Sequence, residues 1–158
     1  MIGQGLRYLR GRFTPFLRDL AHLAVGSDGQ VLTLSNGKPA WGSVVTSYES
    51  AQQTITSAGL LTLAHGLSST PKIISAYLVC QTAEAGYSVG DILPLVGYYS
   101  TASAASSCGY TVVPDATNLN VRFGGNSRAF VALSKNAGVL TGLTNTSWKF
   151  VIVAVALP

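Results

Sequence analysis

The chain has 158 residues and a formal net charge of +4; 47% of its residues are hydrophobic and only 10% are charged. Soluble domains usually carry about 25% charged residues, so we expect other copies of the chain to cover part of this poorly solvated surface. No apolar run approaches the ~18 residues of a membrane-spanning helix. Arginines interrupt the apolar residues near the N-terminus, so we expect synthesis in the cytoplasm without a secretory signal.

Residues 1–25 predict a short amphipathic helix. They contain four arginines and one acid, Asp19, and so carry a net charge of +3. Thr14 and Pro15 suit a helix start, because threonine caps the first turn and proline fits the first helical position. Apolar residues recur there at spacings of three and four and form one stripe. The stripe consists of Phe13, Phe16, Leu17 and Leu20.

This predicted helix is too short to be stable alone and needs a surface on which to lie. A membrane-surface helix usually has a longer and more basic face, and nucleic-acid binding requires a basic patch that the rest of the chain lacks. We therefore expect residues 1–25 to anchor the chain to a protein partner, with the apolar stripe in a groove of that partner. The residues expected to meet acidic groups there are Arg7, Arg10 and Arg12.

Residues 26–46 predict a β-hairpin. Asn36-Gly37 lies between the strand-like run 31–34 and Trp41, and Asn-Gly favours the tight turn of a two-residue hairpin. An isolated two-stranded ribbon is only marginally stable and would leave the Trp41 indole exposed. We therefore expect Trp41 to pack against symmetry-related copies, which makes this segment an oligomerisation module.

Residues 47–158 predict one antiparallel β-sandwich or jelly-roll-like domain. Its strand-like runs are separated by turn signals, and none has a helical period. The expected strands are 53–57, 60–64, 72–82, 88–99, 110–113, 118–123, 129–133 and 148–157. The last run is apolar on both faces, which predicts a central strand that is covered twice, once by a neighbouring subunit.

Residue types that usually carry catalysis or metal binding are sparse and scattered. His22 and His65 belong to no zinc-binding pattern, and Cys80 and Cys108 lie far apart without a Cys-x-x-Cys pair. The sequence also lacks a Gly-x-Ser-x-Gly elbow and a phosphate-binding loop. We therefore expect a non-enzymatic protein with no catalytic residue, no metal and no cofactor. Both cysteines should stay reduced, with Cys108 the more exposed.

The loops of the β-domain are the expected place for recognition. Those with suitable residues are 84–91, 98–108, 124–128 and 135–146. Tyr98, Tyr99 and Arg128 are the candidates for receptor contact, since they offer rings for stacking and a forked hydrogen-bond donor. Alternatively, the two tyrosines only shield the edge of the sandwich. Glu84 and Asp91 could share a cation or a sugar, but we expect them to accept hydrogen bonds from backbone amides of their loop.

Several short segments resemble tail-fibre proteins of bacteriophages and prophages. Gly29-Gln30-Val31-Leu32-Thr33, followed by Trp41-Gly42, resembles a module common in such fibres. Further matches to their C-terminal domains follow in order: His65-Gly66-Leu67 with Pro71-Lys72, Cys80-Gln81-Thr82-Ala83-Glu84, Gly86-Tyr87-Ser88-Val89-Gly90-Asp91, Asp115-Ala116-Thr117-Asn118 and Trp148-Lys149. The resemblance covers residues 29–158.

This resemblance implies a homotrimeric β-structure on a virion, synthesised in the bacterial cytoplasm, with a role in adsorption to the host. Such fibres often have a long shaft before the module, where this chain has only the short segment 1–25. A stub or spike fixed to a capsid, portal or tail is therefore expected, and phage-derived gene transfer agents could use the same part. Two functions remain open: a short fibre or spike that binds a host glycan or protein, and an adaptor, spike base or decoration protein that holds another fibre protein.

Overall fold

The computed structural model describes residues 15, 17–27, 30–43, 45–95, 99–100 and 107–157. It confirms the predicted mostly-β fold, an antiparallel β-sandwich with a hairpin and a short helix before it in the chain. The chain divides into two compact units, residues 1–45 and residues 46–157. We call them the N-terminal unit and the β-domain.

The N-terminal unit contains a helix and a hairpin. Residue 15 and residues 17–21 are helical. Strands β1 (Gln30–Ser35) and β2 (Lys38–Ser43) pair in antiparallel register around the turn at Asn36 and Gly37. Both turn residues have positive φ angles, 53° and 76°, which asparagine and glycine adopt most readily. The Asn-Gly signal therefore predicted this hairpin correctly.

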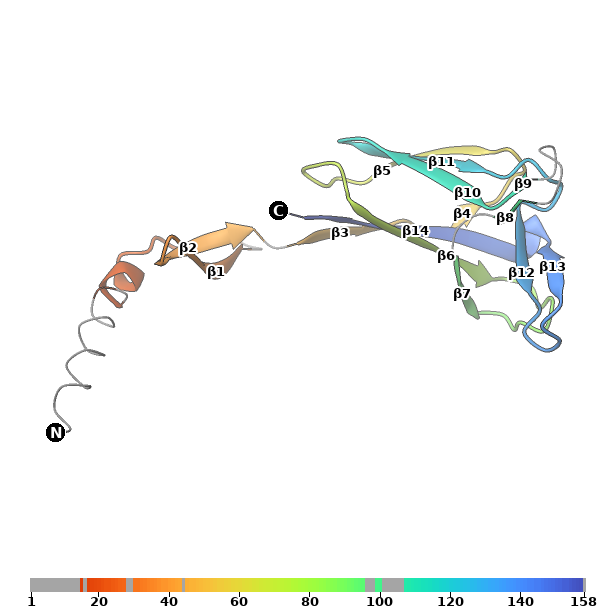
Figure 1. Ribbon diagram of the computed structural model, residues 1–158, viewed down its shortest axis with the longest axis horizontal. Coiled ribbons are helices and arrows are strands. Elements are labelled where there is room, and N and C mark those ends of the chain that lie inside the picture. Colours follow the sequence, from red (N-terminus) through yellow and green to blue (C-terminus); the bar gives the residue numbers. More distant parts are fainter. Residues whose placement is uncertain are drawn as a thin grey trace. The chain divides into compact units, whose positions relative to one another are not determined.

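The described residues of the β-domain form two main sheets and two small ribbons (Figure 1). The larger sheet has the order β3-β14-β6-β7, with β4 also paired to β14, and the smaller sheet has the order β10-β11-β5. The strands of the larger sheet are β3 (Thr46–Glu49), β4 (Gln53–Thr54), β6 (Ile73–Cys80), β7 (Ile92–Leu95) and β14 (Trp148–Ala156). Those of the smaller sheet are β5 (Leu60–Ala64), β10 (Tyr110–Pro114) and β11 (Asn118–Phe123). The ribbons pair β8 (Tyr99–Ser100) with β9 (Ser107–Cys108), and β12 (Phe130–Leu133) with β13 (Leu140–Leu143).

The core lies between the two sheets and is centred on β14. Alternate residues of β14 face inward, and Trp148, Phe150 and Ile152 are fully buried. The ring of Phe150 meets Phe123 edge-on at 5.1 Å between ring centres and stacks on Phe130 at 6.1 Å. Aromatic pairs of this kind add to the free energy gained from burial. β14 therefore joins the two sheets and one of the ribbons into a single core.

Part of the outer face of β14 is covered by the chain itself, and the expected cover by a neighbouring subunit stays a prediction. Val151 lies opposite Tyr77 of β6 and is only 2% exposed. The Tyr77 hydroxyl donates a hydrogen bond of 2.6 Å to Glu49 Oε1 on β3. Because β14 lies between β6 and β3, the tyrosine side chain crosses over it. An amphipathic ring with a polar tip thus covers Val151, whereas Val153 and Val155 on the same face are only partly buried.

Candidate recognition site

Four connections of the β-domain are tied together by hydrogen bonds at one end of the sandwich. They are residues 81–91, 124–129, 134–139 and 144–147. The first and third meet directly, because the Lys135 amide donates to the Ala85 carbonyl at 2.9 Å. We call these connections the loop end. Loops fixed to one another in this way form a preorganised surface, which lowers the entropy cost of binding.

Glu84 ties the first connection to the start of β14. Its Oε1 accepts a hydrogen bond from the Thr144 amide at 2.8 Å, and its Oε2 accepts one from Trp148 Nε1 at 3.2 Å. Both carboxylate oxygens are thus used within the protein. The expectation that Glu84 accepts from backbone amides of its own loop is wrong, because the amide belongs to a distant loop, whereas the same expectation is confirmed for Asp91, which accepts from the Ser88 amide.

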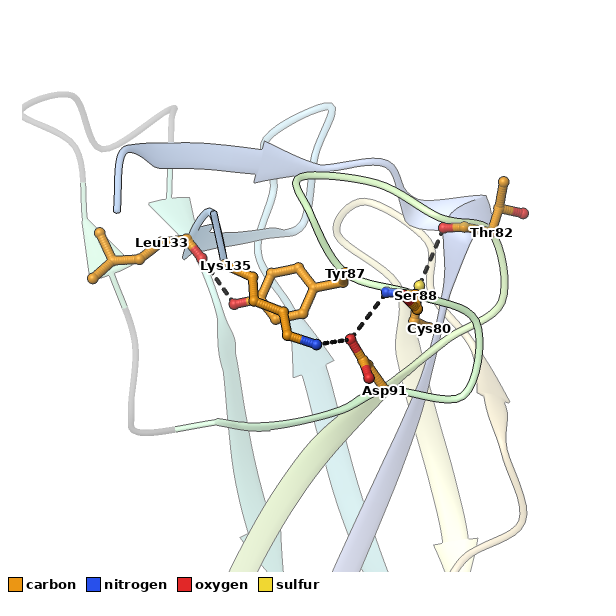
Figure 2. Close-up of polar contacts among 7 residues, drawn as sticks. All are labelled: Cys80, Thr82, Tyr87, Ser88, Asp91, Leu133 and Lys135. Carbon is orange, nitrogen blue, oxygen red and sulfur yellow. Dashed lines mark hydrogen bonds and ion pairs between the residues drawn. The ribbon is translucent and has the colours of Figure 1, made fainter. Parts of the chain in front are cut away.

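Tyr87, Asp91 and Lys135 form the polar centre of the loop end (Figure 2). Lys135 Nζ lies 2.6 Å from Asp91 Oδ2, which also accepts a hydrogen bond from the Ser88 amide at 2.9 Å. The hydrogen bond from Lys135, followed by that from Ser88, lowers the pKa of Asp91 below its ordinary value. The Tyr87 hydroxyl donates to the Leu133 carbonyl at 2.8 Å, and Lys135 Nζ lies 6.0 Å from the Tyr87 ring centre.

Asn145 fastens the remaining connections. Its Oδ1 accepts a hydrogen bond from the Ala129 amide at 2.9 Å, and its Nδ2 donates to the Ser127 carbonyl at 3.2 Å. Asn145 lies in the short 3₁₀ helix η2 (Asn145–Ser147), directly before the buried Trp148. A single amide side chain therefore fixes the loop that carries Arg128 to the start of the core strand.

The structure positions Arg128 closely over the β12–β13 ribbon. Its Nη1 donates a hydrogen bond of 2.6 Å to the Gly142 carbonyl. A Cβ atom at position 142 would lie 2.7 Å from Arg128 Cδ, so a larger residue there would displace the arginine stem from this position. The guanidinium is held in place while further donors stay available for a ligand.

Exposed apolar side chains lie on the same connections and on the β12–β13 ribbon. Leu133 and Leu140 lie opposite each other in the ribbon and are 59% and 45% exposed. Val89, Ile92 and Val139 nearby in the chain are also largely exposed. This combination of an aromatic ring, an ion pair and exposed apolar side chains suits contact with a protein or with the apolar face of a sugar. Among the described residues, no group of three or more metal-ligating side chains comes together.

A shallow pocket of about 180 Å³ lies beside the loop end. It is lined by residues 107–111 of the β9–β10 region and by residues 122–124. Gly124 allows the two segments to approach, because a Cβ atom there would lie 2.4 Å from the Ser107 carbonyl oxygen. The pocket is smaller than the 300–1,000 Å³ typical of ligand sites, and we assign it no ligand.

The receptor-contact candidates are only partly described. Tyr98 lies outside the described residues, and Tyr99 is described only as a backbone partner of Cys108 in the β8–β9 ribbon. Arg128 lies at the loop end, as shown above. Tyr87 and Lys135 were not singled out from the sequence, although both stand in loops expected to carry recognition.

The anchor residues are likewise only partly described. Arg7, Arg10, Arg12, Phe13 and Phe16 lie outside the described residues. The helix includes the other two members of the stripe, of which Leu17 is 56% exposed and Leu20 half-buried.

The Trp41 side chain makes a hydrogen bond and a close packing contact within its own chain. Its Nε1 donates a hydrogen bond of 2.6 Å to the Ala24 carbonyl. Its ring lies so close to Gly26 that a Cβ atom there would come within 2.5 Å of Trp41 Cδ2. The indole is nevertheless 38% exposed, so its packing against another copy stays a prediction.

Both cysteines are buried free thiols, and Cys108, which was expected to be the more exposed, is only 2% exposed against 0% for Cys80. Cys80 Sγ donates to the Thr82 carbonyl at 3.2 Å, as Figure 2 shows, and Cys108 Sγ to the Arg128 carbonyl at 3.5 Å. Burial raises the pKa of both thiols. Because the thiolate is the reactive form, iodoacetamide should label the folded chain roughly 100-fold more slowly than the urea-unfolded chain. Mass spectrometry of labelled peptides measures this, and rapid labelling of either cysteine in the folded chain would contradict it.

No helix in the described part of the chain is long and apolar enough to cross a membrane. In comparisons with known proteins, no family model and no curated protein matches the chain.

Proposed function

We propose that this chain is a non-enzymatic subunit of a bacteriophage-like particle, a short fibre or spike that attaches the particle to the host surface. The N-terminal unit anchors the chain to another virion protein, and the β-domain presents the loop end to a host glycan or protein. The observation that carries this proposal is the mutual fastening of four loops at one end of a rigid sandwich. Rigid scaffolds that position loops in this way commonly serve recognition.

The surface of the N-terminal unit supports an anchoring and assembly role. Its described residues include only three charged side chains, Arg18, Asp19 and Lys38. They also include seven large apolar side chains that are substantially exposed. These are Leu17, Val25, Val31, Leu32, Leu34, Trp41 and Val45. An apolar surface of this kind on a small unit is typical of a segment that is buried against partners. A homotrimer joined through this unit is the proposed assembly.

Adsorption of particles to host cells tests the receptor role. Replacing Tyr98, Tyr99 and Arg128 by alanine removes two rings and the fixed guanidinium, so we expect particles of normal composition that adsorb about 10-fold less. Lys72→Ala is the control, because Lys72 is also an exposed cation but lies near the opposite end of β14, where its amide donates to the Val155 carbonyl at 3.1 Å. Normal adsorption of the triple variant would remove the receptor role.

An adaptor that holds another fibre protein is the second candidate. It is favoured by the exposed pair Leu133 and Leu140, since exposed apolar side chains that lie next to each other are typical of contacts between proteins. If the chain is an adaptor, particles that carry Leu133→Asp and Leu140→Asp should lack a second fibre protein. Particles with alanine at Tyr98, Tyr99 and Arg128 should then adsorb normally. Quantitative mass spectrometry of purified particles distinguishes the two functions.

A further inference from the structure

The edges of the two main sheets differ in how they are protected. In β7, the hydrogen bond from the Cys80 amide to the Asp91 carbonyl fixes the alternation of hydrogen bonds, so that the backbone of Pro94 points away from β6. In β10, the bond from the Asp115 amide to the Asn118 carbonyl likewise places Pro114 at an outward position. Proline has no N–H and prevents pairing with a further strand.

The β3 edge carries the charged residue Glu49 at an outward position, and β4 is only two residues long. Charges and short strands are further ways in which proteins prevent edges from pairing. Each of these edges therefore has a protective feature. The free edge of β5 lies at the other side of the smaller sheet.

Strand β5 lacks every one of these features. Its sequence, Leu60-Leu61-Thr62-Leu63-Ala64, contains no charge and no proline. The Phe123 amide bonds to the Gly59 carbonyl, and the His65 amide bonds to the Thr117 carbonyl. Odd-numbered residues of β5 therefore bond to β11, and the backbone groups of residues 60, 62 and 64 point outward. Within the described residues, no backbone hydrogen bond reaches these outward groups.

We propose that β5 is an interaction surface for a second copy of this chain, which pairs edge to edge with β5 in antiparallel register about a two-fold axis at Thr62. The sequence is nearly symmetric about this residue, so each position meets a compatible one. In this register Thr62 faces Thr62 of the partner copy, Leu60 faces Ala64, and Leu61 faces Leu63. Threonine pairs and aliphatic pairs are both favourable across antiparallel strands.

The hydrogen-bond geometry agrees with the same register. In an antiparallel ladder, two directly opposed residues exchange both of their backbone bonds only if their N–H and C=O groups point toward each other. Residues 60, 62 and 64 all meet this condition when Thr62 lies on the axis. A shift by one residue would oppose outward groups with inward ones. The absence of charge on β5 means that bringing two identical strands together causes no like-charge repulsion.

This two-fold contact is separate from the three-fold association proposed for the N-terminal unit. A two-fold axis cannot relate copies within a trimer, so the contact would join chains of neighbouring trimers. It does not depend on the proposed function, because the pairing concerns only the backbone and side chains of β5. A closed contact of this kind pairs the outward backbone groups of β5 in both copies, so neither copy can add a further strand there.

Disulfide trapping in the full chain tests the register. Opposed residues of a bonded antiparallel pair have Cα atoms about 5.5 Å apart, which lies within the range of about 4.4–6.8 Å found in disulfides. Under mild oxidation, Thr62→Cys should give a band at twice the chain mass of 16.4 kDa on a non-reducing gel. Leu60→Cys is the matched control, since it faces Ala64 rather than itself, and it should stay at the single-chain mass. The native thiols are buried.

Charged substitutions at Thr62, the residue on the axis, provide an independent test that does not require a disulfide to form. Thr62→Lys and Thr62→Glu each place like charges against each other, so each should self-associate at least 10-fold more weakly in analytical ultracentrifugation. An equimolar mixture of the two should regain the association of the unchanged chain. Equal trapping of Leu60→Cys, or no trapping of Thr62→Cys, would overturn the proposal. So would unchanged association of Thr62→Lys, or trapping of Thr62→Cys onto a different protein.

Discussion

Replacing Phe150 by alanine should lower the free energy of unfolding of the β-domain by about 3–5 kcal/mol. The ring is fully buried and contacts Phe123, Phe130 and Tyr110, so its removal leaves a cavity at the junction of both sheets and the β12–β13 ribbon. Domains of this size are usually stable by only about 5–15 kcal/mol. Urea denaturation followed by circular dichroism measures the change.

Val155→Ala on the same strand is the control for this experiment. Val155 lies on the outer face of β14 opposite Ile73 and is only partly buried. Its truncation removes fewer contacts and should cost less than about 1.5 kcal/mol. Equal losses for the two variants would mean that the domain is not organised around an inner face of β14.

Replacing Leu17 and Leu20 together by aspartate should remove the protein from particles. The helix offers these two apolar side chains on one face, and burial of a carboxylate in a partner groove without a partner charge is strongly unfavourable. Immunoblots of purified particles, compared with the cell lysate, measure the number of copies that are mounted. The lysate should contain a normal amount of the variant, because the helix does not belong to the β-domain.

His22→Asp is the control, since it introduces one of the two added negative charges directly after the last helical turn, on the side away from Leu17 and Leu20. This variant should be mounted at the normal copy number. If the double variant is also mounted normally, residues 1–25 are not the anchor. If neither variant is mounted, the charge of the segment decides mounting rather than its apolar stripe.

The elements that could be predicted from sequence are those with a strong local signal. The hairpin follows from Asn36-Gly37, and β14 from an uninterrupted apolar run. Strand β3 (Thr46–Glu49) was not predicted, because its residues show no apolar alternation and it forms only by pairing with β14. Strand β13 (Leu140–Leu143) was not predicted either, because Gly142 lowers its strand propensity. The carbonyl of Gly142 accepts the hydrogen bond from Arg128. The expected strand 88–99 proved shorter, because residues 88–91 form a turn closed by Asp91.

The candidate site was predictable only as a set of loops. That Glu84 bonds to Thr144 and Trp148, 60 and 64 residues away, follows from the pairing of strands across the whole domain. Composition gives no sign of such contacts, since their partners are set by the topology rather than by neighbours in the sequence. Tyr87 could have been noticed as an aromatic residue beside a tight turn, whereas its contact with Lys135 could not.

The two tryptophans of the chain give each unit its own optical reporter. Trp148 is completely enclosed in the β-domain and lies edge-on to Tyr87 at 5.3 Å, whereas Trp41 of the N-terminal unit is 38% exposed. Indole emission shifts to longer wavelengths in contact with water, and soluble quenchers reach only exposed rings. A quencher such as acrylamide therefore lowers the emission of Trp41 in the N-terminal unit but not that of Trp148 in the folded β-domain. Loss of the unquenched, blue-shifted component marks the opening of the sandwich, so one spectrum follows two separate folding events.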